Sequence, residues 1–202
     1  TDNIYMYYGE TVQNTVSDGQ NANRVFDFTA GTGNNFVGVW HMSQSPAGGA
    51  GAIKDSTPGA HNGTSAGTMT ASDLVDALVG TGIDFDGVDD VIDCGTGGIL
   101  NVGTNLTLEA WGYYNSTAYA WRGFVGRTGA ANTADYSLDM TAGGNFRGWI
   151  SNNSWDTGVA IPQQQWFHVV FTYTAGTNTP RVLYLNGASV ATSNLTATIN
   201  NT

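Results

Sequence analysis

The second half of the chain repeats one pattern, a short apolar or alternating run that ends in a turn-forming residue. Four such runs are 82–87 (GIDFDG), 106–111 (LTLEAW), 165–170 (QWFHVV) and 183–187 (LYLNG). A period of two is typical of strands with one buried face. No stretch keeps a helical period for three turns, and the best short candidate, 71–78, offers a single helical turn. The sequence therefore predicts an all-β fold of short antiparallel strands, as in a two-sheet sandwich.

Composition narrows the possible partners. The chain has 202 residues, 41% of them hydrophobic, which suffices for one sandwich domain. Its net charge is −10, with only six Lys plus Arg. Nucleic-acid binding depends on clustered cations, so no nucleic-acid partner is expected. No run of 18 apolar residues occurs, so no membrane insertion is expected in this segment.

Strand-like patterns continue along the whole chain. A first strand is expected at 36–42, and a hairpin is expected to join 83–85 to 91–94 around the turn 86–90. Turn residues separate the remaining candidates. These lie at 106–114, 123–127, 136–140, 146–150, 158–159, 166–173, 181–186 and 188–192.

Several motifs occur in a particular order: Trp40-His41-Met42, the loop 53–64 (IKDSTPGAHNGT), the strand 106–111, and Trp166 two residues before His168. In this order they resemble the laminin-G-like branch of the concanavalin A-like lectin/glucanase fold, over about 36–195. The resemblance implies a jelly-roll β-sandwich of two antiparallel sheets at 36–202. Such modules serve mostly in recognition outside the cell, which points to an extracellular or cell-surface location.

Residues 1–35 read differently, as an N-terminal β extension and linker. They resemble the closing piece of a small β domain of unknown function that precedes laminin-G-like modules in prokaryotic surface proteins. The family's closing strand has no counterpart after Leu195. Either the chain is a fragment of a longer protein, or a strand from another copy fills the gap by β-strand addition. The candidate donor strand is Ile4, Tyr5, Met6, Tyr7 and Tyr8.

The number and positions of the glutamates and aspartates argue against a catalytic role. Glucanases of this fold use a Glu-rich cluster on one strand, whereas this chain has two glutamates, Glu10 and Glu109, in separate segments. Glu109 is expected on a strand face with a hydrogen-bonding partner. Asp84 and Asp86 would share a strand face about 7 Å apart, but an ordinary strand end with an Asp-Gly turn is the favoured explanation. We therefore expect no enzyme.

One structural calcium ion is a possible cofactor. The resemblance places it near the loop that contains Asp55 and Asn62, whose oxygens suit calcium. The alternative is that both residues only organise turns. The acidic segment Asp84, Asp86, Asp89 and Asp90 is a second-choice site, because close carboxylates repel unless neutralised.

Sugar recognition needs an exposed aromatic ring beside amides or carboxylates. The segments 113–115, 119–122 and 152–156 fit this description, with Trp121 and Trp155 in polar, loop-like surroundings. The candidate ligand-binding residues are Trp121, Trp155, Tyr114, Asn153 and Asp156. The other tryptophans, at 40, 111, 149 and 166, lie in strand patterns and are expected in the core.

Six Asn-x-Ser/Thr sequons give weak support for secretion. They lie at Asn62, Asn105, Asn115, Asn152, Asn194 and Asn200. The single cysteine, Cys94, excludes an intrachain disulfide and is expected to be a small buried residue.

The leading hypothesis is a non-catalytic extracellular recognition or adhesion module of a larger surface or appendage protein, with a glycan as ligand. The second is a structural subunit of an extracellular filament, joined to copies of itself by strand exchange. The third, disfavoured by the carboxylates, is a glucanase-type glycoside hydrolase.

Overall fold

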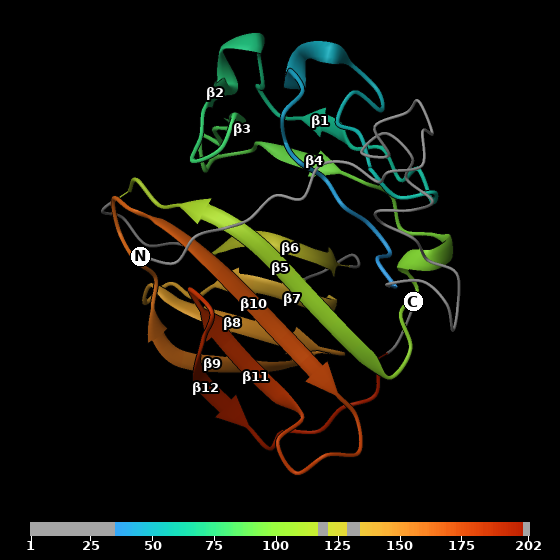
Figure 1. Ribbon diagram of the computed structural model, residues 1–202, viewed down its shortest axis with the longest axis vertical. Helices are drawn as coiled ribbons and strands as arrows, with labels where there is room; N and C mark the ends of the chain where they lie inside the picture. Colours follow the sequence, from blue (N-terminus) through green and yellow to red (C-terminus); the bar gives the residue numbers. More distant parts are fainter. Residues whose placement is uncertain (1–34, 117–120, 129–133, 200–202) are drawn as a thin grey trace, which may run out of the picture.

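A computed structural model describes residues 35–116, 121–128 and 134–199. Two four-stranded antiparallel sheets lie face to face, one ordered β12-β11-β10-β5 and the other β6-β7-β8-β9 (Figure 1). The fold class predicted from the alternating runs, an all-β sandwich, is confirmed. The predicted N-terminal extension and its donor strand, residues 4–8, lie outside the described residues.

The first sheet is built from four long runs, and β10 pairs with both β5 and β11. Its strands are β5 (Asn105–Tyr113), β10 (Trp166–Thr174), β11 (Arg181–Leu185) and β12 (Ala188–Ser193). The second sheet is a meander of β6 (Arg122–Thr128), β7 (Ala134–Met140), β8 (Asn145–Ile150) and β9 (Asn153–Ala160). The sequence located all eight, although it predicted only the end of β9.

The core fills the space between the sheets because every second residue of the long strands points inward. Buried and half-buried positions alternate strictly along β8 and along most of β10. Phe146 and Phe167 meet edge to face, with ring centroids 5.5 Å apart. Gly148 on β8 leaves room for Phe171, because a Cβ there would lie 2.8 Å from the ring of Phe171. Further core residues are Leu138, Met140, Ile150, Val169 and Leu183.

A cap of short elements lies over one end of the sandwich (Figure 1). It contains β1 (Thr64–Ala66) paired with β4 (Val91–Asp93), and β2 (Leu74–Asp76) paired with β3 (Thr81–Ile83). Three short 3₁₀ helices, η2 (Pro46–Gly48), η3 (Ala71–Asp73) and η4 (Gly98–Leu100), connect the strands. Of the helical candidate 71–78, only Ala71–Asp73 forms a 3₁₀ turn, η3, and Leu74–Asp76 forms the strand β2 instead.

Two expectations for the cap are wrong. The predicted hairpin between 83–85 and 91–94 does not form, since β3 pairs back onto β2 and β4 pairs with β1. The predicted first strand, 36–42, is reduced to a single bridge between Trp40 and Asp55. β3 takes the neighbouring strand β2, whereas β4 and Trp40 take partners farther away along the chain, and local alternation does not report such partners.

Candidate functional site

The outer surface of β6-β7-β8-β9 carries polar and aromatic side chains in ordered rows. Antiparallel register places Asp139, Arg147 and Asp156 side by side across β7, β8 and β9. The next row holds Ser137, Trp149 and Ser154. Cross-strand partners share one face of a sheet, so these side chains form one surface. We call it the arginine face and define it as Trp121, Asp139, Asn145, Arg147, Trp149 and Asp156.

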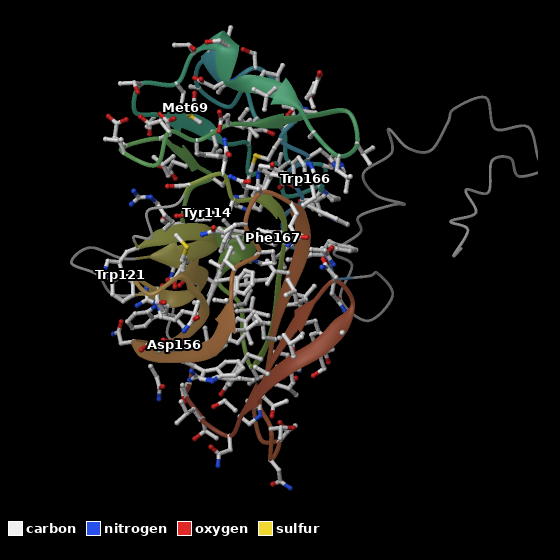
Figure 2. The ribbon with its side chains drawn as sticks, turned by 90° about the vertical axis from the view of Figure 1, so that its left-hand side faces the viewer. Met69, Tyr114, Trp121, Asp156, Trp166 and Phe167 are labelled. Atoms are coloured by element: carbon white, nitrogen blue, oxygen red, sulfur yellow. The ribbon has the colours of Figure 1, made fainter. Side chains whose placement is uncertain are left out.

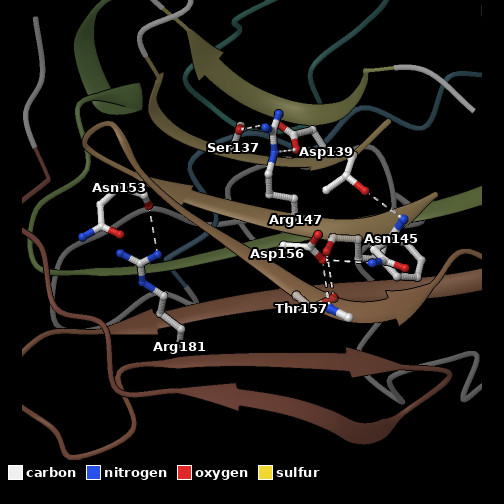
Figure 3. Close-up of polar contacts among 11 residues, drawn as sticks. Ser137, Asp139, Asn145, Arg147, Asn153, Asp156, Thr157 and Arg181 are labelled. Atoms are coloured by element: carbon white, nitrogen blue, oxygen red, sulfur yellow. Dashed lines mark hydrogen bonds and ion pairs between the residues drawn. The ribbon is translucent and has the colours of Figure 1, made fainter. Parts of the chain in front are cut away.

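Arg147 is the fixed centre of the arginine face. Its Nε and Nη2 donate to Asp139 Oδ1 and Oδ2 at 2.6 and 3.0 Å, a two-pronged ion pair whose side chains are only 15% and 14% exposed (Figure 3). Ser137 Oγ donates a further hydrogen bond to Asp139 Oδ2. Two-pronged guanidinium–carboxylate contacts fix geometry as well as charge. The pair therefore behaves as a rigid, internally neutralised unit.

Two indole rings lie against this guanidinium. Arg147 Cζ is 4.2 Å from the ring centroid of Trp121 and 4.6 Å from that of Trp149. Both distances are within the range of a cation–π contact. Trp121, just before β6, nevertheless stays 58% exposed. One part of its ring is held by Arg147, and the rest faces solvent on the same side as Asp156 (Figure 2).

Hydrogen-bonding groups lie beside the rings. Asp156 Oδ1 accepts from Asn145 Nδ2 at 3.1 Å and from the Gly158 N–H at 2.9 Å (Figure 3). Asp156 is exposed, and its other oxygen has no partner among the described residues. Gly123 pairs with Asp139 on the same face, and a Cβ there would meet nothing within 4 Å. The arginine face thus offers a ring, an open acceptor and empty space above Gly123.

The predicted ligand-binding residues do not all reach this surface. Trp121 and Asp156 do. Trp155 lies in β9 rather than in a loop, on the side that packs on the core, with its ring 6.3 Å from that of Phe171. Asn153 begins β9, and its carbonyl accepts from buried Arg181 at 2.9 Å (Figure 3). Tyr114 is half-buried against the core beyond β5.

The expectation that the other four tryptophans belong to the core is wrong for three of them, since half-buried Trp166 also lies on an outer surface, beside Tyr113. Trp111 is 58% exposed on β5, and Trp149 stands on the outer face of β8. Trp40 is half-buried in the cap, where its Nε1 donates to the carbonyl of His61 at 2.7 Å. The sequence contained the information needed to place Trp111 outside. Leu106 and Leu108 point inward, so the alternation along β5 turns residue 111 outward.

The loop with Asp55 and Asn62 is organised by its own hydrogen bonds. Asp55 Oδ1 accepts from the N–H groups of Val39 and Thr57, and Oδ2 accepts from Thr57 Oγ1 and the His61 N–H, all within 3.0 Å. Asn62 Oδ1 accepts from the Asp55 N–H. A carboxylate has about four acceptor positions, and all four are used. These residues do not fit a calcium site and match the alternative, a turn-organising role.

Three carboxylates of the second-choice segment approach one another. Oxygens of Asp86, Asp89 and Asp90 lie within 4.8 Å of one another. Asp86 Oδ1 accepts from the N–H groups of Val88 and Asp89, and its own N–H donates to Asp90 Oδ2. The Val88 bond is the main cause of a lowered pKa at Asp86. Turn formation accounts for the contacts of Asp86, whereas Asp90 Oδ1 is buried with no hydrogen-bond partner among the described residues.

The remaining predicted positions are Glu109, Cys94 and the asparagines of the sequons. Glu109 was expected on a strand face with a partner, and its Oε1 indeed contacts His168 Nε2 at 2.9 Å. Cys94 is half-buried, and burial raises the pKa of its thiol to about 11. Among the sequons, Asn62 is half-buried, Asn200 lies outside the described residues, and the rest are exposed: Asn105, Asn115, Asn152 and Asn194.

One family comparison bears on identity. A laminin-G family model, described as the concanavalin A-like lectin/glucanases superfamily, matches residues 86–202, more than half of the chain. The match includes both four-stranded sheets and leaves residues 1–85 outside, with 36–85 of the predicted module among them. No curated protein matches the chain. In the described part of the chain, no helix is long and apolar enough to cross a membrane. The chain belongs to the concanavalin A-like lectin/glucanases superfamily, whose laminin-G-like modules bind carbohydrates or other ligands.

Proposed function

We propose that this chain is a non-catalytic glycan-recognition module that acts outside the cell, in adhesion by a larger surface or appendage protein. Trp121 on the arginine face is its stacking platform. The observation that carries the proposal is an indole ring that is 58% exposed yet held from one side by a fixed guanidinium. An exposed ring with little freedom left to lose stacks a ligand at low entropic cost.

The neighbouring groups favour a neutral sugar. Asp156 has an open carboxylate oxygen that can accept from a sugar hydroxyl, beside the amide of Asn145. Arg147, the one cation among the six residues of the arginine face, is already neutralised by Asp139. Exposed Arg122, next to Trp121, donates to the Trp121 carbonyl. The face itself therefore offers no spare cation for a sulfate or uronate. The space above Gly123 adjoins Asp139 on this face and leaves room for a bound residue.

Binding to immobilised neutral polysaccharides tests the proposal. Trp121→Ala removes the stacking surface and should weaken binding about tenfold or more. Gly123→Leu should fill the empty space without strain and weaken binding by a similar factor. A matched control is Leu78→Ala in the cap, an exposed apolar residue 53% accessible and outside the face, which should bind as the wild type. Wild-type affinity in both test variants would contradict the proposal.

Two other outcomes would favour the alternative functions. Release of reducing sugar, lost on replacement of Asp84 or Asp86, would assign a glycoside hydrolase. Ordered polymers in negative-stain images that disappear when residues 4–8 are deleted would assign a strand-exchanged filament subunit. We expect neither from a recognition module.

A further inference from the structure

The opposite sheet carries a second exposed tryptophan with a support of its own. On β5 and β10, alternation and register place Glu109, Trp111 and Tyr113 beside Val170, His168 and Trp166 on the outer surface. We call the set Glu109, Trp111, Tyr113, Trp166 and His168 the histidine face. Trp111 is 58% exposed and Tyr113 is 46% exposed. None of these residues belongs to the arginine face, which lies on the other sheet.

The ring of Trp111 is supported by the ring of His168. The two rings are stacked, with centroids 4.9 Å apart and planes 29° from parallel. Adjacent strands lie about 4.8 Å apart, so the two side chains rise next to each other from neighbouring strands. One face of the indole is therefore covered by the imidazole. The other face looks away from β10, toward the side on which β5 pairs with no strand in the described ranges.

His168 is itself held in place. Its Nε2 contacts Glu109 Oε1 at 2.9 Å. Its backbone N–H donates to Asn186 Oδ1, and its carbonyl accepts from the Asn186 N–H. Glu109 thus positions the imidazole, and the imidazole positions the indole. A supported ring keeps its free face available to a ligand without a large loss of side-chain entropy.

We propose that the free face of Trp111 is a second stacking site for a neutral glycan chain, which makes the module bivalent. Along β5, Glu109 and Tyr113 lie two residues to either side of Trp111 on the same surface and supply a carboxylate and a phenol for sugar hydroxyls. The two sites lie on opposite sheets, so one molecule would bridge two glycan chains.

Charge favours a neutral ligand over an acidic one. Neither β5 nor β10 contains a lysine or arginine, and the exposed acid on this face is Glu109, whose side chain is 54% exposed. A sulfated or uronate-rich polymer would meet a carboxylate instead of a cation, which disfavours binding. The histidine face can therefore bind a ligand by ring stacking and by hydrogen bonds to hydroxyl groups.

The experiment isolates this site in the full 202-residue chain carrying Trp121→Ala. Cello-, xylo-, manno-, laminari- and chitohexaose are titrated into it by calorimetry. We expect one of the five to bind still, and Trp111→Ala in this background to weaken that binding about tenfold or more. Leu78→Ala is the matched control. Glu109→Gln, which keeps a hydrogen-bonding group, should retain more affinity than Glu109→Ala, and only the latter should change the near-ultraviolet circular dichroism of the indoles.

Cross-linking gives a second readout. The wild type should precipitate a soluble polysaccharide of the bound type, whereas either single tryptophan variant should bind it without precipitation. Unchanged affinity after Trp111→Ala, or no sugar binding by the Trp121→Ala protein, would overturn the second site while leaving the first intact. Dimers in analytical ultracentrifugation that disappear with Trp111→Ala would also overturn it, by assigning this face to a second copy.

Discussion

Each of the two sheets exposes one tryptophan to the same extent, 58%, and each ring rests on a nitrogen-bearing side chain that a carboxylate holds. On the arginine face the order is Trp121, Arg147, Asp139. On the histidine face it is Trp111, His168, Glu109. The supports differ in burial, since Arg147 and Asp139 are 15% and 14% exposed while His168 and Glu109 are 22% and 54% exposed. The arrangement of a tryptophan, a nitrogen-bearing side chain and a carboxylate therefore occurs on both sheets. Its support is largely buried on the arginine face and more exposed on the histidine face.

The largest effect is expected where the support is most buried. Arg147→Ala leaves Asp139 nearly buried without its cation and should lower the free energy of unfolding by about 3 kcal/mol. Arg147→Lys keeps the charge but loses the two-pronged contact, so its cost should fall between those of the wild type and the alanine variant. Urea unfolding measures both. A loss below about 1 kcal/mol for the alanine variant would show that this support is no more rigid than the other.

A third carboxylate sharpens the comparison, because Asp55 is held by four hydrogen-bond donors and, among the residues that the structure describes, by no cation. Asp55→Ala should cost about 2 to 3 kcal/mol, since it leaves buried donors unpaired. The loss should be equal with calcium and with a chelator.

The thiol of Cys94 reports on the cap, because a pKa of about 11 and partial burial keep it slow to alkylate at pH 8.

In the Asp55→Ala protein we expect Cys94 to be alkylated faster, because the cap opens and because Asp55 no longer raises the pKa of the thiol. An effect of calcium on this reaction would support a calcium site at Asp55. If calcium slowed alkylation of the wild type and not of the variant, Asp55 would be a calcium ligand.

The smallest effect is expected at the looser support. Glu109→Gln removes the charge from a carboxylate that is more than half exposed, so the free energy of unfolding should change by less than about 1 kcal/mol. The change should shrink further at high salt. A loss as large as that of Arg147→Ala would remove the distinction between the two faces.

The sandwich could be predicted from the sequence because alternation along each long strand shows which of its sides is buried. Leu106 and Leu108 in β5, and Phe146 and Ile150 in β8, mark the buried side by alternation alone. The same phase could have placed Trp111 and Trp149 outside, but the usual burial of tryptophan outweighed it in the prediction. The hairpin at 83–94 failed because strands of three residues carry too little pattern to select a partner.

The contacts of the two faces could not be predicted in the same way. Arg147 meets Asp139 because the turn between β7 and β8 sets their register, and His168 meets Trp111 across strands joined only through a long stretch of chain. Register depends on turn geometry and on the packing of the whole sheet. Residue type alone marked Trp121 and Asp156, and the structure added the support that fixes the first of them.

The central claim is that each sheet presents one supported tryptophan to a sugar. The most direct test is nuclear magnetic resonance of the indole N–H groups of the ¹⁵N-labelled protein, assigned with Trp→Phe variants, during titration with the neutral oligosaccharide that binds. The resonances of Trp121 and Trp111 should shift, while those of Trp40, bonded to His61, and Trp155, packed on the core, should stay. Shifts confined to Trp40 and Trp155, or no shift at saturating sugar, would contradict the account.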